Sequence, residues 1–335
     1  MIYKLPDYKS LEVSEKVADY LGIKRNLLNT DDIIDWSKQI ANLPKVWQQT
    51  KGEGIKIAIL DSGITEHADF DGAIKGCVNY TREPDMTDNE NHGTLIAGIV
   101  GARINNTGVL GVAPKCDLYI AKVMDANKNY DTEHVVQGLE WALKKDVDIV
   151  SISLGMTEYH QGIHDAIKDL VSANKHVICS AGNDRKLTFP ASLPETIAVG
   201  SIGKYLISRS GYLGCGLDFV APGVGLWSIN RFARLHYIQS GTSFAAPFIA
   251  ALSALILSKH RKTTSRTEVK DTADLKDHLK KMSLDLGGVG WDGIYGYGFP
   301  GHKSVQIESE FVSLLDPKDL TPKGYKKLMK YLSHT

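Results

Sequence analysis

A turn rich in small and hydroxyl-bearing residues, at residues 240–247, offers the clearest candidate nucleophile in the sequence. Gly241 makes the turn, Thr242 and Ser243 supply hydroxyls, and an apolar helical run follows. If a helix starts there, its unpaired N–H groups and positive dipole end lie beside the Ser243 hydroxyl, where they stabilise negative charge developing on an attacked carbonyl. A serine in this position is also a common helix N-cap. Ser243 therefore indicates catalysis only if the chain supplies partners for it.

Asp61 and His92 are the partners that a nucleophilic serine requires. Asp61 directly follows a short β-branched run at residues 55–60, and His92 precedes Gly93 at the beginning of an apolar helical pattern. Considered alone, the aspartate is explained as a turn residue and the histidine as a helix cap. Acyl transfer needs a serine activated by an imidazole, and an imidazole oriented by a carboxylate. Together the three side chains predict nucleophilic catalysis.

Short apolar strands alternate with helical patterns through the middle of the chain, and this order decides where those side chains lie. The expected strands are residues 55–60, 117–123, 147–154, 176–180 and 196–199, and the expected helices are residues 132–145 and 162–173. Such alternation predicts an α/β fold, a parallel sheet with helices on both faces. Ligands bind at the carboxyl ends of the strands in these sheets. Asp61, residues 153–155 and residues 181–183 should therefore meet at one edge.

Three motifs follow one another in a fixed order, at residues 61–64 (DSGI), 92–94 (HGT) and 241–243 (GTS). In this order they resemble the motifs of the subtilisin-like serine proteases. Shorter matches support the resemblance at residues 111–114 (GVAP), 151–155 (SISLG), 180–183 (SAGN), 218–223 (DFVAPG) and 296–298 (GYG). The resemblance runs from about Trp47 to Gly301. It implies a single catalytic domain with three α/β/α layers, similar in style to the intracellular subtilisins.

The resemblance implies a role for each of the candidate catalytic residues. Ser243 would be the nucleophile, His92 the general base and then the general acid, and Asp61 the buried group that orients His92. Asn183 would donate its side-chain amide to the oxyanion, together with the backbone N–H of Ser243. Such a donor is worth on the order of 10² to 10³ in turnover. The expected function is that of a serine endopeptidase that needs no cofactor for its chemistry.

Two other functions would use the same residues. A catalytically silent subtilisin-like fold would bind peptides without cutting them, and a peptide transferase or cyclase would use the same acyl-enzyme while excluding water. The intact set of Asp61, His92, Asn183 and Ser243 argues against the silent fold. The sequence does not separate a transferase from a hydrolase.

Peptide or protein substrates are expected from the same resemblance. Ser153, Leu154 and Gly155 would form an edge that pairs with an extended peptide through backbone hydrogen bonds. Gly182 and residues 189–192 would border the first specificity pocket, which we expect to accept medium or large apolar side chains.

A structural calcium ion is the one metal that the resemblance suggests. Asp69 and the carbonyl groups of residues 104–109 are the candidate ligands. The sequence departs from the pattern here, because residues 61–69 and residues 104–109 are each one residue shorter than in secreted bacterial relatives. A hard cation needs about six to eight oxygens in defined positions. An Asn- and Gly-rich surface turn is therefore an equally good explanation of the loop.

The chain divides into three expected parts. Residues 1–45 form an N-terminal extension, residues 46–305 the catalytic domain, and residues 306–335 a helical tail with a solvated, charged face. Pro6, within residues 3–8, favours an extended conformation. This segment could therefore lie across the peptide-binding edge as the inhibitory leader of a zymogen, and a disordered tail is the alternative.

Composition excludes several other classes of function. The 335 residues carry 39 basic and 39 acidic side chains, so no excess of charge points to nucleic acid or to an anionic membrane. The chain opens without an apolar signal core, and we expect no membrane-spanning segment. Its 4 cysteines are far apart and lack the spacing of metal ligands. We expect a reduced, cytoplasmic protein, with export by another route left open.

Overall fold

The computed structural model describes residues 32–301, except residues 107, 212, 233–234, 239 and 264–268. The segment expected to act as an inhibitory leader, residues 3–8, and the expected tail, residues 306–335, lie outside the described residues. What the sequence indicates about those two segments stays a prediction.

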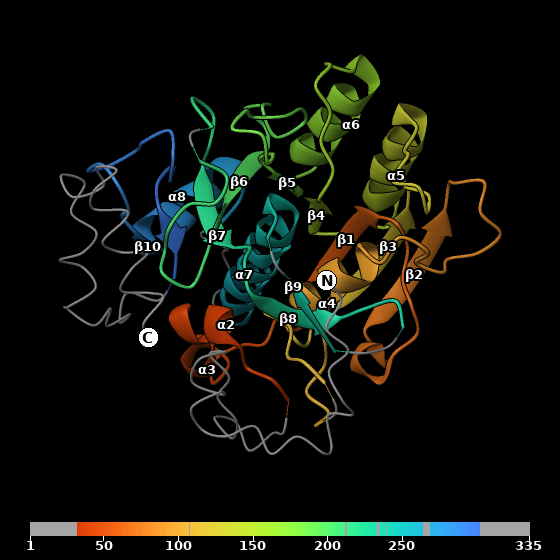
Figure 1. The fold of residues 1–335 in the computed structure, drawn as a ribbon, viewed down its shortest axis with the longest axis horizontal. Coiled ribbons are helices and arrows are strands. Elements are labelled where there is room, and N and C mark those ends of the chain that lie inside the picture. Colours follow the sequence, from red (N-terminus) through yellow and green to blue (C-terminus); the bar gives the residue numbers. More distant parts are fainter. Residues whose placement is uncertain are drawn as a thin grey trace, which may run out of the picture.

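A parallel sheet of seven strands forms the middle layer of the structure (Figure 1). The strands are β1 (Lys56–Asp61), β2 (Ile74–Asn79), β3 (Asp117–Lys122), β4 (Ile149–Ile152), β5 (His176–Ser180), β6 (Ile197–Ile202) and β7 (Phe219–Pro222). They lie in the order β2-β3-β1-β4-β5-β6-β7, and every neighbouring pair is parallel. The expected α/β fold is confirmed. The half-buried β2 and the four-residue β7 are strands that the sequence pattern did not reveal.

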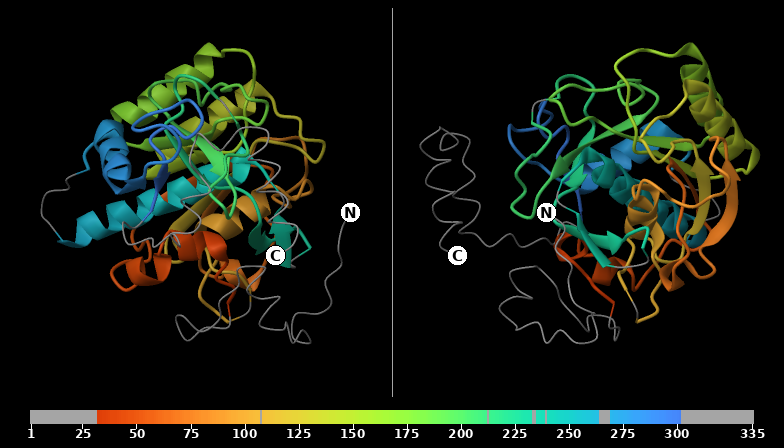
Figure 2. Two further views of the ribbon diagram at one scale, coloured as in Figure 1. Left: turned by 60° about the vertical axis from the view of Figure 1, so that its left-hand side comes forward. Right: turned by 45° about the vertical axis from the view of Figure 1, so that its right-hand side comes forward.

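Four helices cover the two faces of the sheet: α4 (Gly93–Gly101), α5 (Thr132–Lys144), α6 (Gln161–Ser172) and α7 (Thr242–Thr263). Figure 2 shows α5 and α6, coloured yellow to green, on one side of the sheet and α7, in teal, on the other. Side chains of β1 alternate between the two layers. Ile57 and Ile59 pack in the core with α4 and α7, whereas Ala58 and Leu60 pack in the core with α5 and α6. The structure therefore has the expected three layers.

Shorter elements complete the described part of the chain. Helices α2 (Trp36–Ile40) and α3 (Leu43–Val46) precede β1, the short helix η2 (Ala68–Phe70) lies between β1 and β2, and α8 (Thr272–Met282) follows α7. Two small antiparallel sheets pair β8 (Leu226–Ile229) with β9 (Leu235–Ile238), and β10 (Ser283–Leu284) with β11 (Phe299–Pro300).

Residues 32–45, which the sequence analysis assigned to an extension, contribute buried side chains to the core. Ile34 and Trp36 are buried, and both belong to the core cluster that contains α4 and α7. The carboxylate of Asp35 accepts the backbone N–H of Trp227, which lies in β8, at 2.9 Å. A leader that could leave without opening the core would therefore end before this segment. The boundary at residue 45 stays a prediction.

Among the described residues, helix α7 resembles a membrane span by length and composition. Its residues Thr242–Lys262 are long and apolar enough to cross a membrane, which the sequence analysis did not recognise. However, 83% of the apolar window is buried inside the fold. A core helix has the same length and composition, so this helix is weak evidence for a membrane span.

The carboxyl ends of β1, β4 and β5 lie side by side at one edge of the sheet. Asp61 is the last residue of β1, Ser153 follows β4, and Asn183 comes three residues after β5. β1 pairs directly with β4, and β4 pairs with β5. The topology thus delivers three of the candidate site residues to one place, as expected of a parallel sheet.

Candidate active site

Asp61 and His92 form a hydrogen-bonded pair at this edge. Nδ1 of His92 lies 2.9 Å from both carboxylate oxygens of Asp61, and Asp61 is only 1% exposed. An ionised carboxylate only accepts hydrogen bonds, so Nδ1 carries the proton and donates a hydrogen bond to Asp61. Nε2 of the neutral ring then keeps a lone pair that can accept a proton. Asp61 is therefore able to orient His92 as a general base.

Two glycines allow the end of β1 to approach the start of α4. A Cβ atom on Gly93 would lie 2.3 Å from the carbonyl oxygen of Gly63, and a Cβ atom on Gly63 would lie 2.3 Å from that of Met86. Gly63 also has a φ of +113°, which other residues rarely adopt. The glycines of the DSGI and HGT motifs therefore permit the close approach that brings Asp61 and His92 together.

Asp88 fixes the turn that leads into His92. Its carboxylate is fully buried and accepts the Ser62 hydroxyl at 2.7 Å. It also accepts the backbone N–H groups of Asn91 and Thr94, both at 2.8 Å. Since Asn91 and Thr94 flank His92, Asp88 holds the backbone on both sides of the histidine. Asp88 is not among the site residues predicted from the sequence, where its place four residues before His92 is the only signal.

Three carboxylates influence the protonation of His92. Burial disfavours the charged imidazole and lowers its pKa, but the negative charges of Asp61, Glu90 and Asp88 outweigh burial. The pKa of His92 is therefore raised above its ordinary value. A raised pKa makes the neutral ring a stronger base, and it moves to higher pH the point at which His92 becomes neutral.

Ser243 is the second residue of α7, so the N-terminal end of that helix lies beside its hydroxyl. In this structure the Ser243 hydroxyl donates to the carbonyl oxygen of Ser153 at 3.2 Å. The ring of Phe244, the next residue, lies 5.4 Å from the ring of His92, so the start of α7 lies close to His92. The hydroxyl is thus bonded to Ser153 and not to Nε2 of His92. Catalytic hydrogen bonds are often long or misaligned until a substrate is present.

Thr242 sets the orientation of the Asn183 side chain. Oδ1 of Asn183 accepts the backbone N–H of Thr242 at 3.0 Å and its hydroxyl at 3.1 Å. A backbone N–H can only donate, so the atom facing Thr242 must be the amide oxygen. Nδ2 of Asn183 is then available as a donor on the opposite side of the amide. In the sequence, Thr242 stands out only as a member of the GTS motif.

The predicted peptide-binding residues lie beside Ser243 at the end of β4. Leu154 is buried, whereas Gly155 is exposed. Gly155 and Gly182 both pack against Thr188, because a Cβ atom on Gly155 would lie 2.4 Å from the Thr188 hydroxyl and one on Gly182 would lie 3.0 Å from its methyl group. The structure therefore brings Gly155 and Gly182 together, and their role in binding stays a prediction.

Hydrogen bonds organise the loop that was expected to hold calcium. Asp69 accepts the side-chain amide of Asn105 and the backbone N–H of Val109, each at 3.0 Å. Asp32 accepts two backbone N–H groups of the same loop, from Asn105 at 3.0 Å and from Gly108 at 3.2 Å. The pKa of Asp69 is raised, first by burial and also by the charge of Asp32.

These contacts do not suit a hard cation, which requires oxygen ligands rather than N–H groups around it. Within the described part of the chain, no group of three His, Cys, Asp or Glu side chains could hold a metal ion. The described contacts of Asp69 therefore do not support a calcium site, and calcium binding by this loop stays a prediction.

Comparison with known proteins finds one matching family model and several curated relatives. The model described as the subtilase family matches residues 52–298. The intracellular serine protease of Paenibacillus polymyxa is 36% identical over 266 residues, which cover 74% of this chain and 80% of that protein. Subtilisin Savinase of Lederbergia lenta is 33% identical over 255 residues, which cover 74% of this chain and 88% of that protein.

Other relatives are longer than the matched region. The minor extracellular protease Epr of Bacillus subtilis is 30% identical over 306 residues, which cover 88% of this chain but 45% of that protein. The match to alkaline elastase YaB of Bacillus sp. covers 61% of that protein. The chain thus spans less than two thirds of each of these two relatives.

Proposed function

Because this chain belongs to the subtilase family, we propose that it is a serine endopeptidase that cuts peptide bonds through an acyl-enzyme on Ser243. In the first step Nε2 of His92 takes the proton of the Ser243 hydroxyl as its oxygen attacks the scissile carbonyl. His92 then gives that proton to the departing amine. A water molecule, activated in the same way, releases the new carboxylate and restores Ser243.

The bond between His92 and the buried carboxylate of Asp61 is the observation that carries this proposal. With both Asp61 oxygens 2.9 Å from Nδ1, the proton is held on that nitrogen and the lone pair on the other. The same carboxylate stabilises the imidazolium that forms when His92 accepts the proton. An isolated structural histidine would not need an orienting carboxylate beside a serine at a helix N-terminus.

Asn183 is the proposed side-chain donor to the oxyanion. The two bonds from Thr242 to its Oδ1 support this role, because they fix the amide plane before any substrate arrives. A donor that is already oriented costs little reorganisation free energy when negative charge develops on the oxyanion. The backbone N–H of Ser243, at the start of α7, is the proposed second donor.

Peptide or protein chains are the proposed substrates, and Ser153, Leu154 and Gly155 are the proposed pairing edge. Their position directly after β4 and beside Ser243 supports this assignment. No observation on the described residues favours a silent peptide-binding fold or a transferase.

Digestion of a peptide library in water enriched in heavy oxygen tests the proposal. Hydrolysis through an acyl-enzyme should place the heavy isotope in the new carboxyl termini, and the Ser243→Ala variant should give no such products. Joined or cyclic peptides that lack the isotope would identify a transferase. The absence of any cleavage by the folded wild-type chain would contradict a peptidase.

A further inference from the structure

Glu90 has an unsatisfied carboxylate oxygen close to the candidate active site. It lies two residues before His92, and its side chain is only 7% exposed. Oε1 of Glu90 is 2.9 Å from Nζ of Lys128, whereas Oε2 is buried and has no hydrogen-bond partner among the described residues. A buried, unpaired charged oxygen is unfavourable unless a donor reaches it. Lys128 alone therefore leaves the Glu90 carboxylate incompletely paired, and this points to a second cation that brings further donors.

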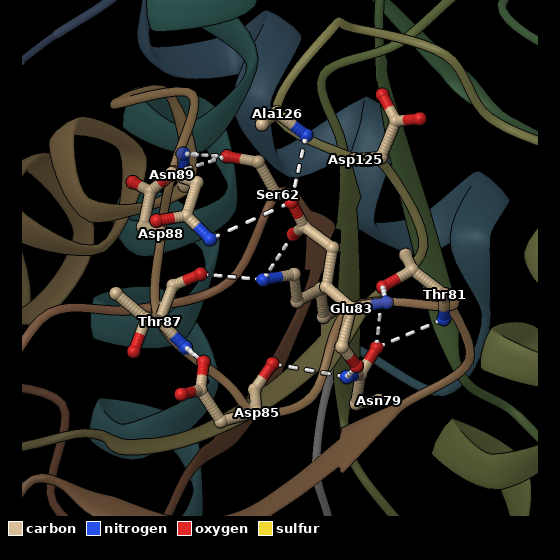
Figure 3. Close-up of polar contacts among 12 residues, drawn as sticks. Ser62, Asn79, Thr81, Glu83, Asp85, Thr87, Asp88, Asn89, Asp125 and Ala126 are labelled. Carbon is tan, nitrogen blue, oxygen red and sulfur yellow. Dashed lines mark hydrogen bonds and ion pairs between the residues drawn. The ribbon is translucent and has the colours of Figure 1, made fainter.

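The loop that carries Glu90, between β2 and α4, is firmly held at other positions. Figure 3 shows Glu83 at the centre of its polar contacts, with Thr87 and Asn89 nearby. Nζ of Lys122, a fully buried lysine, lies 2.6 Å from Glu83, and the backbone N–H of Ala126 donates to the same carboxylate at 3.3 Å. Glu90 therefore belongs to a loop whose backbone is anchored by these contacts.

Lys128 approaches Glu90 from the neighbouring turn between β3 and α5. The Lys128 side chain is 75% exposed, so its ion pair with Glu90 is accessible to solvent and easily exchanged. Two residues further on, the hydroxyl of Tyr130 donates to the carbonyl oxygen of Gly155 at 2.7 Å. This turn thus makes two contacts. Tyr130 contacts the proposed peptide-binding edge at Gly155, and Lys128 contacts Glu90, which lies two residues before His92. A substrate lying along Gly155 toward His92 would pass beside Glu90.

We propose that Glu90 binds a lysine or arginine side chain of the substrate at one position flanking the scissile bond, and that Lys128 pairs with Glu90 when that side chain is absent. The substrate cation would reach the carboxylate as the exposed Lys128 side chain moves away, and it would donate to Glu90 with more than one N–H group. Among the described residues no group of three His, Cys, Asp or Glu side chains that includes Glu90 could hold a metal ion, so a basic side chain suits the site better than a metal ion. The inference rests on the proposed peptidase function.

Peptides that differ only by lysine or glutamine, tested at each position around one cleavage site, provide the measurement. At a single position wild type should prefer lysine in kcat/KM by on the order of 10- to 100-fold, the range expected for a hydrogen bond to a charged group. Glu90→Gln should bring this ratio close to one, and higher salt should reduce it. The ratio cancels any effect of Glu90 on His92, because both peptides meet the same enzyme.

Lys128→Gln distinguishes the proposal from a purely structural ion pair. If Lys128 competes with the substrate, its removal should raise the preference for lysine, in the direction opposite to Glu90→Gln. Glu140→Gln, which removes an exposed acidic side chain from α5, is the matched control and should leave the ratio unchanged. A ratio near one at every position in wild type would overturn the proposal. So would an unchanged ratio in Glu90→Gln, or equal losses in the Glu90 and Lys128 variants.

Binding to the Ser243→Ala chain separates this inference from the peptidase proposal. Calorimetry with the same lysine and glutamine peptides should show tighter binding of lysine, and Glu90→Gln should remove the difference. This result without cleavage by wild type would contradict the peptidase and leave the Glu90 site standing. Cleavage without any preference in either assay would contradict the Glu90 site alone.

Discussion

The carbonyl oxygen of Ser243 accepts the hydroxyl of Ser153 at 2.7 Å, in place of a hydrogen bond within its own helix. Pro247 lies four residues further along α7 and has no backbone N–H, so the helical bond to Ser243 cannot form. The Ser243 hydroxyl donates back to the Ser153 carbonyl at 3.2 Å. The proline therefore explains how the end of β4 is tied to the residue proposed as the nucleophile.

Ser153→Ala should lower the free energy of unfolding by about 1 kcal/mol, because the partly buried Ser243 carbonyl loses this donor. In a Pro247→Ala background the same change should cost less, because alanine supplies the missing backbone N–H. Denaturant unfolding of the four proteins, all carrying Ser243→Ala to prevent self-cleavage, measures this coupling. Strictly additive effects would show that Ser153 does not replace the helical bond.

Asn183→Ala should lower kcat by on the order of 10²- to 10³-fold and change KM little, because the donor acts on charge that is present mainly in the transition state. Thr242→Val removes a hydroxyl bond to Asn183 and should give a smaller fall in kcat. Thr242→Ser keeps the hydroxyl and is the control. Equal kcat values for the valine and serine variants would mean that the Thr242 hydroxyl does not help to orient the amide, which the backbone N–H of residue 242 would then hold alone.

The pH dependence of kcat/KM should reflect the raised pKa of His92. Only the neutral ring accepts the Ser243 proton, so activity should rise with pH, with its midpoint above the ordinary histidine value. Asp61, Glu90 and Asp88 are the carboxylates that raise this pKa. Glu90→Gln removes one of these negative charges and should move the midpoint to lower pH. An uncharged peptide is the appropriate substrate, and a midpoint that stayed in place or rose would contradict this account.

A chain that begins at residue 42 should be much less stable than one that begins at residue 32. The shorter chain lacks the buried side chains of Ile34 and Trp36, and burying each such side chain contributes about 1.5–3 kcal/mol. Thermal unfolding of both chains, with Ser243→Ala in each, provides the comparison. Equal melting temperatures would show that residues 32–41 do not support the core.

The candidate catalytic residues could be found in the sequence because each belongs to a short contiguous motif at the end of a strand or the start of a helix. Gly93, for example, directly follows His92 in the sequence, and it permits the close approach that places His92 beside Asp61. Asp88 and Glu90 were missed because their contacts involve residues brought together by folding, such as Lys128. Asp69 is a candidate calcium ligand in the sequence, but the approach of Asp32 to the same loop is visible only in three dimensions.

Labelling with a fluorophosphonate tests the central claim most directly, because the reagent reacts with serines that are activated as nucleophiles. The experiment uses the full chain and the chain that begins at residue 32, so that an inhibitory leader cannot hide the site. Mass spectrometry should find one adduct, on Ser243, with no labelling in Ser243→Ala and much slower labelling in His92→Ala. If the folded chain beginning at residue 32 stayed unlabelled, or reacted at another serine, Ser243 would not be the nucleophile.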